Sequence, residues 1–214
     1  MSHQTRVLWL LGISLLGIFI WSLVRPHDYF TWFLEVLPAI VGIAVLVGTY
    51  HRFRFSTLVY VLIWAHAIIL IIGGHYTYAE MPLFSWIRDA YGLSRNHYDR
   101  LGHFAQGFVP ALVAREVLLR TTPLRKGKML FYIIVSICLA ISALYELCEW
   151  RAAVAFGDSA TAFLGTQGDP WDTQWDMTFA LIGATVSLLT MGRWHDRSMR
   201  TVMELPAQAA RPAA

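Results

Sequence analysis

The sequence predicts an all-α integral membrane protein, a bundle of six transmembrane helices with both termini in the cytoplasm. Three observations predict this fold class. The chain of 214 residues is 57% hydrophobic and only 14% charged, whereas a soluble domain is roughly a quarter charged. The charges lie in short clusters between long apolar runs. The basic clusters alternate with connections that lack them, as topology in a membrane requires.

Six apolar segments are each long enough to cross about 30 Å of hydrocarbon. We expect helices, because a helix satisfies its own backbone hydrogen bonds in lipid and the alternating ten-residue strands of a membrane barrel are absent from the sequence. The first segment resembles a signal sequence, but it continues into Arg25-Pro26-His27 without a small-residue cleavage site and is interpreted as a retained span. The expected spans are residues 7–24, 32–49, 56–73, 101–119, 129–148 and 176–192.

Lys and Arg residues beside the spans set the expected orientation, because cytoplasmic connections are enriched in them. Four basic regions fall on one side of the expected bundle, and the connections 25–31, 74–100 and 149–175 form the other side. Residues 1–206 are expected to form a single domain, and the Ala- and Pro-rich tail 207–214 is expected to be disordered. The basic positions are Arg6, the Arg52 and Arg54 connection, the connection 120–128 and the tail with Arg193, Arg197 and Arg200.

The net charge of +3 does not indicate nucleic-acid binding, because the basic residues form small groups beside apolar segments and are interpreted as topology signals. Cys138 and Cys148 are ten residues apart in one expected helix. That spacing separates them by about 15 Å, too far for a disulfide. The expected partners are membrane lipids, and the sequence leaves the oligomeric state open.

The acidic residues lie almost entirely on the side opposite to the basic clusters. Membrane insertion does not require this bias, since Asp and Glu contribute little to topology. A further role is therefore predicted for them. They are Asp28, Glu35, Glu80, Asp89, Asp99, Glu146, Glu149, Asp158, Asp169, Asp172 and Asp176.

Three consecutive expected helices each bring a pair of polar residues to this outer level. Members of a pair are three or four residues apart, so their side chains share one helix face. Carboxylates inside a membrane are costly and normally face the bundle interior with a partner. The pairs are Asp99 with His103, Glu146 with Glu149, and Asp172 with Asp176.

A divalent metal ion is one partner that this pattern predicts. Oxygen and imidazole ligands from facing helices suit Mg²⁺, Mn²⁺, Fe²⁺ or Zn²⁺. In an enzyme, the ion would polarise a phosphoryl or carbonyl oxygen or activate water, with His103 or His97 as general base and Asp99 beside them. The candidate metal ligands are Asp99, His103, Glu146, Glu149, Asp172 and Asp176, with His75 from the loop above.

The alternative is a protein without enzymatic activity that binds, transports or acts as a scaffold. Arg95, Arg100 or Arg151 would then pair with the carboxylates in a structural network, or the cluster would be a proton or cation path. Asp169 and Asp172 are equally well interpreted as N-caps of the last helix. Broken helices would favour a transporter, but only Pro38 and Pro110 interrupt the expected spans and no repeat pairs them, which weakens that interpretation.

Several other polar residues have simpler expected roles. The aromatic loop 73–96 is expected to lie in the membrane interface. His66 is interpreted as a hydrogen-bonded packing residue and Glu35 as an interfacial charge. Arg115 and Glu116 are expected to snorkel toward the cytoplasm.

Four motifs resemble the YjdF-like family of bacterial inner-membrane proteins. They are Gly-Gly-His-Tyr-Thr-Tyr at 73–78, His-Tyr-Asp-Arg-Leu-Gly-His at 97–103, Tyr-Glu-Leu-Cys-Glu-Trp at 145–150 and Gly-Thr-Gln-Gly-Asp-Pro-Trp-Asp-Thr-Gln-Trp-Asp-Met at 165–177. The resemblance spans essentially the whole chain. It implies a multi-span protein of the inner membrane, in a family with no established activity.

Residues 99–192 also resemble, more distantly, the VanZ-like superfamily. In that pattern one helix starts with Asp-x-x-x-His, the next ends with Glu and the next starts with Asp-x-x-x-Asn; Asp99 with His103, Glu146 and Asp172 fit these places. Asp176 stands where Asn is expected, so this chain is more acidic than the pattern, which favours a bound cation. The leading expectation is a multi-pass inner-membrane protein whose carboxylate and histidine site at the periplasmic interface belongs to a metal-dependent enzyme acting on a lipid-linked or envelope substrate.

Overall fold

The computed structural model describes residues 3–157 and 161–209, and over these residues it is helical with no strands. Five of its helices are long and apolar enough to cross a membrane. This confirms an all-α protein with several candidate spans. The five are α1 (His3–Ser22), α2 (Tyr29–Thr49), α3 (Thr57–Tyr76), α6 (Lys128–Phe156) and α8 (Asp172–Ala209).

The expected fourth span, 101–119, lies within α5 (Tyr98–Thr121), which has 24 residues but is not among the apolar candidates. Charged residues near both of its ends lower its hydropathy. Most of them are buried inside the bundle, so α5 is a central helix with polar ends. The charged residues of α5 are Asp99, Arg100, Arg115, Glu116 and Arg120.

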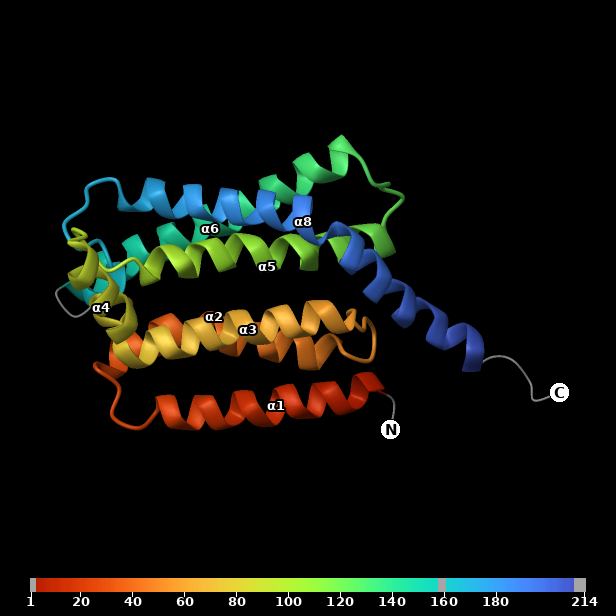
Figure 1. Cartoon of the computed structure of the whole chain (residues 1–214), viewed down its shortest axis with the longest axis horizontal. Coiled ribbons are helices and arrows are strands. Elements are labelled where there is room, and N and C mark those ends of the chain that lie inside the picture. The colour runs from red at the N-terminus through yellow and green to blue at the C-terminus, as the bar shows by residue number, and fades with distance from the viewer. Residues whose placement is uncertain (1–2, 158–160, 210–214) are drawn as a thin grey trace.

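The helices form two groups that run roughly parallel to one another (Figure 1). α2 and α1 pack on α3, and α6 and α8 pack on α5, while contact between α3 and α5 joins the groups. α1 begins and α8 ends at the same end of the bundle, here called the termini end. The connections α1–α2, α3–α5 and α6–α8 lie at the opposite end, here called the far end.

The long connection between α3 and α5 is mostly helical, which the sequence did not predict. It contains the 3₁₀ helix η1 (Tyr78–Glu80) and α4 (Pro82–Tyr91), whose residues are all at least partly exposed. Leu83, Trp86 and Tyr91 of α4 are more than half exposed. Exposed aromatic side chains at the end of an apolar bundle fit the expected interfacial position.

α5 and α8 approach each other closely because glycines remove the side chains between them. A Cβ atom on Gly107 would lie 1.8 Å from the Ala180 carbonyl oxygen, and one on Gly183 would lie 2.1 Å from the Phe104 carbonyl oxygen. Small residues permit such backbone contact between membrane helices. The approach fixes the register of the two helices that carry Asp99 and Asp176.

Arg115 and Glu116 do not snorkel as expected, because both are buried in a polar network near the termini end. The fully buried Glu116 carboxylate accepts hydrogen bonds from the Ser56 N–H at 2.8 Å and from Arg120 at 2.6 Å. Arg115 donates to Asp196 at 2.7 Å. We call this set, which also contains His195, the termini-end network.

The last helix is longer than the expected span 176–192 and continues to Ala209. Residues 207–209 of the expected disordered tail are therefore the end of α8. Residues 210–214 of that tail and the acidic Asp158 lie outside the described residues.

Candidate metal centre

Six buried carboxylates meet at the far end of the bundle, and we call them the carboxylate cluster. They come from four helices, α2, α5, α6 and α8, and each is at most 8% exposed. One buried arginine and one buried histidine, Arg95 and His103, lie among them. The members are Glu35, Asp99, Glu146, Glu149, Asp172 and Asp176.

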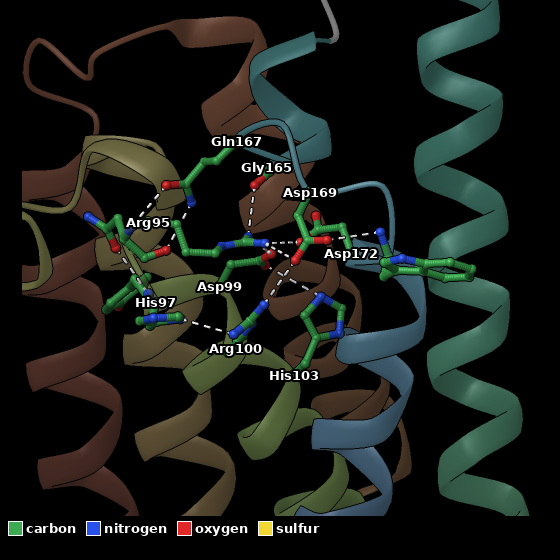
Figure 2. Close-up of polar contacts among 12 residues, drawn as sticks. Arg95, His97, Asp99, Arg100, His103, Gly165, Gln167, Asp169 and Asp172 are labelled. Atoms are coloured by element: carbon green, nitrogen blue, oxygen red, sulfur yellow. Dashed lines mark hydrogen bonds and ion pairs between the residues drawn. The ribbon is translucent and has the colours of Figure 1, made fainter. Parts of the chain in front are cut away.

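Arg95 binds one side of this cluster (Figure 2). Its guanidinium pairs with Asp172 and donates to the Gly165 carbonyl at 3.1 Å. The Asp99 and Asp169 carboxylates lie 3.7 and 3.6 Å away. Arg95 thus joins the start of α5 to the start of α8.

Arg100 lies outside the cluster, against the loop before α8. It donates to Asp169 at 3.2 Å, and its guanidinium also lies 3.3 Å from His97 Nδ1 and over the Trp175 ring. Arg151 is exposed and lies beside Trp150. The expected arginine network therefore includes Asp169 and the start of α8, whereas no arginine forms an ion pair with the α6 glutamates over the described part of the chain.

Asn96 and Gln167 hold the two loops of the site together without charge. The Asn96 N–H donates to Gln167 Oε1 at 2.8 Å, and Gln167 Nε2 donates to the Asn96 carbonyl at 2.9 Å. Asn96 also donates to Ser85 and accepts from the Tyr98 N–H. Left-handed backbone at Gly165, Gln167 and Gly168 forms the turn that directs Asp169 toward the arginines.

His103 is at the centre of the cluster. Its Nε2 lies 3.4 Å from Asp99 Oδ1 and 3.7 Å from Glu146 Oε1, and its Nδ1 lies 3.0 Å from Gln106 Oε1. When Nδ1–H donates to Gln106, the Nε2 lone pair faces the carboxylates. A lone pair between carboxylates is repulsive, so Nε2 requires either a proton or a cation beside it.

Asp99, His103 and Asp176 each present a ligand atom, and these atoms lie within 4.8 Å of one another. Asp176 Oδ1 and Glu146 Oε1 are buried and have no hydrogen-bond partner. Buried polar atoms are normally hydrogen-bonded, so these two unpartnered oxygens indicate that a cation or a proton binds there. Of the predicted ligands, this geometry brings Asp99, His103, Asp176 and Glu146 together.

The remaining predicted residues take different positions. Asp172 is held by Arg95, and the buried Glu149 lies within electrostatic range of Asp99, Glu146 and Asp176. Asp169 accepts from the Trp171 N–H at 3.0 Å just before α8. It therefore supports the helix start without occupying the N-cap position, because α8 begins at Asp172.

Two predicted histidines lie apart from the cluster. His75 is bonded through Nδ1 to the Ser22 carbonyl at 3.0 Å and its ring lies against Trp21, so it belongs to the α1–α3 contact. His97 faces Arg100. Burial, followed by the positive charges of Arg100 and Arg95, lowers the pKa of His97, which favours its neutral form.

Sequence reasoning missed Glu35 and Gln106. Glu35 is 2% exposed, not interfacial, and its Oε2 has no partner. It shares the 3.6-residue period of the buried Trp32, Val36 and Ala39, which is a signal of burial that could have identified it. Gln106 follows His103 by three residues, the spacing at which helical side chains meet.

Comparison with known proteins reveals similarity over most of the chain. A family model described as "Predicted membrane protein (DUF2238)" matches residues 7–197. The chain is 49% identical over 189 residues to "Inner membrane protein YjdF" of Escherichia coli (strain K12), a match that covers 88% of this chain and 90% of that protein. No solved structure matches. The resemblance to the VanZ-like superfamily stays a prediction.

Proposed function

The chain belongs to the family of membrane proteins described as DUF2238, and from this premise we propose that it is a six-span inner-membrane protein with a divalent metal ion in its carboxylate cluster. α5 is the fourth of the six spans in chain order, and its buried charges are shielded from lipid by the other helices. The basic connections at the termini end support a cytoplasmic position for both termini. The carboxylate cluster then lies at the periplasmic end.

The main support for a metal ion comes from the surroundings of His103. A metal-binding histidine generally donates its other ring N–H to an oxygen acceptor, which fixes the ring and its tautomer. Gln106 Oε1 is that acceptor, and His103 Nε2 faces Asp99 and Glu146. Asp176 supplies a vacant carboxylate oxygen from the facing helix.

The donor set fits a divalent ion. Asp99, His103 and Asp176 would hold it, with Glu146 as a fourth ligand, and the mixture of carboxylate and imidazole suits Mn²⁺, Fe²⁺ or Zn²⁺ better than a cage for Ca²⁺. A bound ion of this kind polarises a substrate oxygen or activates water. Among the buried carboxylates of α6 and α8, Glu149 is the one left to accept a proton, because His103 is committed to the metal.

Elemental analysis of detergent-purified protein tests the metal. The wild-type protein, purified from cells grown with added Mn, Fe or Zn, should hold one ion per chain, and Asp99→Asn and Asp176→Asn should lose it. Asp89→Asn is the matched control, because Asp89 is exposed on α4 and pairs with its neighbour Arg88. Wild-type protein without metal under every supplementation would overturn the proposal.

A periplasmic reporter tests the topology. Fused after Ala214, alkaline phosphatase should be inactive, while the same fusion in the far-end connection at Gly92 should be active. Gly92 is exposed and follows α4. Activity after Ala214 would contradict the cytoplasmic position of the C-terminus.

A second function, a membrane protein that binds or conducts protons or cations without catalysis, is favoured by one observation. A proton on His103 Nε2 would make an imidazolium that pairs with Asp99 and Glu146 at the observed distances. This form needs no metal. It predicts that chelators leave the melting temperature unchanged, whereas the metal form predicts that they lower it.

A further inference from the structure

A cavity of about 590 Å³ adjoins His103 on the side away from the far end. Residues of α2, α3, α5 and α6 line it, together with Tyr78 of η1. This volume is within the range of about 300–1,000 Å³ that small-molecule sites occupy. The cavity is separate from the carboxylate cluster and shares only His103 with it.

The wall of the cavity is largely apolar and reaches the outer surface of the bundle. Gly42 on α2, with Leu144 and Cys148 on α6, line it and are exposed. α2 packs on α3, and α6 packs on α5 and α8, so the opening lies between helices of different groups. In a membrane, hydrocarbon chains surround such an opening, and a lipid can enter from the side.

Polar atoms inside the cavity lack partners. The Tyr78 hydroxyl and His66 Nε2 are both buried without a hydrogen bond, and Tyr78 is only 7% exposed. His66 is therefore not the hydrogen-bonded packing residue that the sequence suggested. Unpartnered buried donors and acceptors of this kind need a ligand or water to satisfy them.

The charges around the cavity restrict the ligand. The lining holds no Lys, Arg, Asp or Glu, and the carboxylate cluster lies beyond His103. An anionic headgroup would meet repulsion from those carboxylates and find no cation along the lining. A hydroxyl or carbonyl group can instead exchange hydrogen bonds with Tyr78 and His66 at no electrostatic cost.

We propose that this cavity binds a long-chain lipid that ends in an uncharged hydroxyl or carbonyl group. The hydrocarbon chain passes between α2 and α6, and the polar end meets Tyr78 and His66 next to His103. One part of this proposal rests on the proposed function, namely that such a lipid is the substrate class of the metal centre. The binding itself requires no metal.

Photolabelling of the purified protein in lipid nanodiscs tests the proposal. The probe is a C18 alcohol that carries a diazirine near mid-chain. It should label peptides of α2 and α6 saturably, and monoolein should compete with it. Octadecyl phosphate, which has the same chain and an anionic end, should compete at least tenfold less well. Equal competition by the phosphate, or labelling that does not saturate, would overturn the proposal.

Two glycines of α2 provide a matched pair of variants. Gly42 and Gly48 both have open space around an added Cβ, but only Gly42 lines the cavity. Gly42→Leu should abolish saturable labelling, while Gly48→Leu should keep it. Tyr78→Phe removes only the hydroxyl. It should lower the affinity for the C18 alcohol about fivefold, which corresponds to one net hydrogen bond. Equal labelling of both glycine variants would contradict the assignment.

The labelling of Asp176→Asn separates this inference from the metal centre. Asp176 does not line the cavity, so this variant should bind the C18 alcohol like the wild type even when it contains no metal. If the wild type holds no metal but is labelled as predicted, the metal proposal fails and the lipid site stands. If the metal is present and labelling is absent, only the proposal of a lipid site is refuted.

Discussion

His195 Nε2 lies 3.0 Å from Glu116 Oε2, and both side chains are fully buried. The other ring nitrogen lies 3.0 Å from an Arg115 guanidinium nitrogen. Each of these three charged or polar groups therefore has its hydrogen-bond partners inside the protein. A buried network that is fully satisfied in this way is typical of a structural role.

The carboxylate cluster differs from this termini-end network in one physical respect. Its buried acids outnumber the buried cations, and Asp176 Oδ1, Glu146 Oε1 and Glu35 Oε2 have no partners. Natural proteins seldom keep such groups without a use. The contrast between the two ends of one bundle favours a functional site at the far end.

We predict that Glu116→Gln destabilises the protein and leaves the metal content unchanged. The substitution removes the carboxylate that Arg120 and His195 Nε2 face, a loss of about 3–5 kcal/mol for a broken buried pair. The melting temperature in detergent should fall, and elemental analysis of the surviving folded fraction should match the wild type. A fall in metal content with an unchanged melting temperature would contradict the structural role of this network.

We predict that Gly183→Ala disrupts the contact between α5 and α8. Its Cβ would lie 2.1 Å from the Phe104 carbonyl oxygen, and because that oxygen belongs to the backbone the helices must separate. The cost should reach at least the roughly 1–3 kcal/mol of an overpacked core. The measurement is the folded fraction by size-exclusion chromatography after heating.

Gly192→Ala in the same helix is the control, since an added Cβ there has no neighbour within 4 Å. Alanine in a helix interior is about 0.5–1 kcal/mol better than glycine, so this variant should be neutral or slightly more stable. Equal loss in the two variants would show that the close approach of α5 and α8 is not the cause.

We predict that Gln106→Leu weakens metal binding without removing a ligand. The change deletes the acceptor for His103 Nδ1, and loss of such a supporting hydrogen bond typically lowers metal affinity about 10–100-fold. Competition against a chelator of known affinity measures the change. Gln106→Glu keeps an acceptor oxygen, so this variant should bind the metal more tightly than Gln106→Leu. Identical affinity in all three proteins would argue that His103 is not a ligand.

We predict that Asp28 stabilises the start of α2 in a pH-dependent way. Its carboxylate accepts from the Thr31 N–H at 2.6 Å, and this hydrogen bond lowers the pKa of Asp28 from its ordinary value of 3.8. The stabilisation is therefore present above about pH 3.8 and is lost as the pH falls through the lowered pKa. Asp28→Ala should cost about 1 kcal/mol at neutral pH.

Asp28→Asn tests the same helix start without the charge. Asparagine is as good an N-cap as aspartate, so its melting temperature at neutral pH should stay near that of the wild type. The difference in melting temperature between Asp28→Ala and the wild type should be smaller at pH 3 than at neutral pH. A difference that is constant with pH would show that the carboxylate is not the cap.

Much of the fold followed from local pattern, because hydrophobic length and basic clusters are properties of neighbouring residues. The pairs Asp99 with His103 and Asp172 with Asp176 were also predictable, since helical spacing places each pair on one face. Arg115 could not be placed correctly, because its partners His195 and Asp196 are about eighty residues away in the chain. Position near a helix end suggested snorkelling, and tertiary packing overrode it.

The site showed the same division between local and distant information. His75 was expected at the site because its loop is near the outer level, but packing against Trp21 directs it to α1. Glu35 was expected at the interface because a charge near a helix end usually is. Its period within α2 indicates burial, but its neighbours Tyr78 of η1 and Asp99 of α5 are distant in the sequence and could not be predicted from that period.

The reciprocal amide pair of Asn96 and Gln167 has a consequence for experiments on this family. It ties together the segments before α5 and α8 by hydrogen bonds between neutral groups. This tie between the two segments does not depend on the ionisation of the acids, unlike the ion pairs of Arg95 with Asp99 and Asp172. Glu146 and Asp176, whose oxygens Oε1 and Oδ1 have no hydrogen-bond partner, can therefore be changed to their amides while the two segments stay joined, and a lost activity can then be assigned to chemistry.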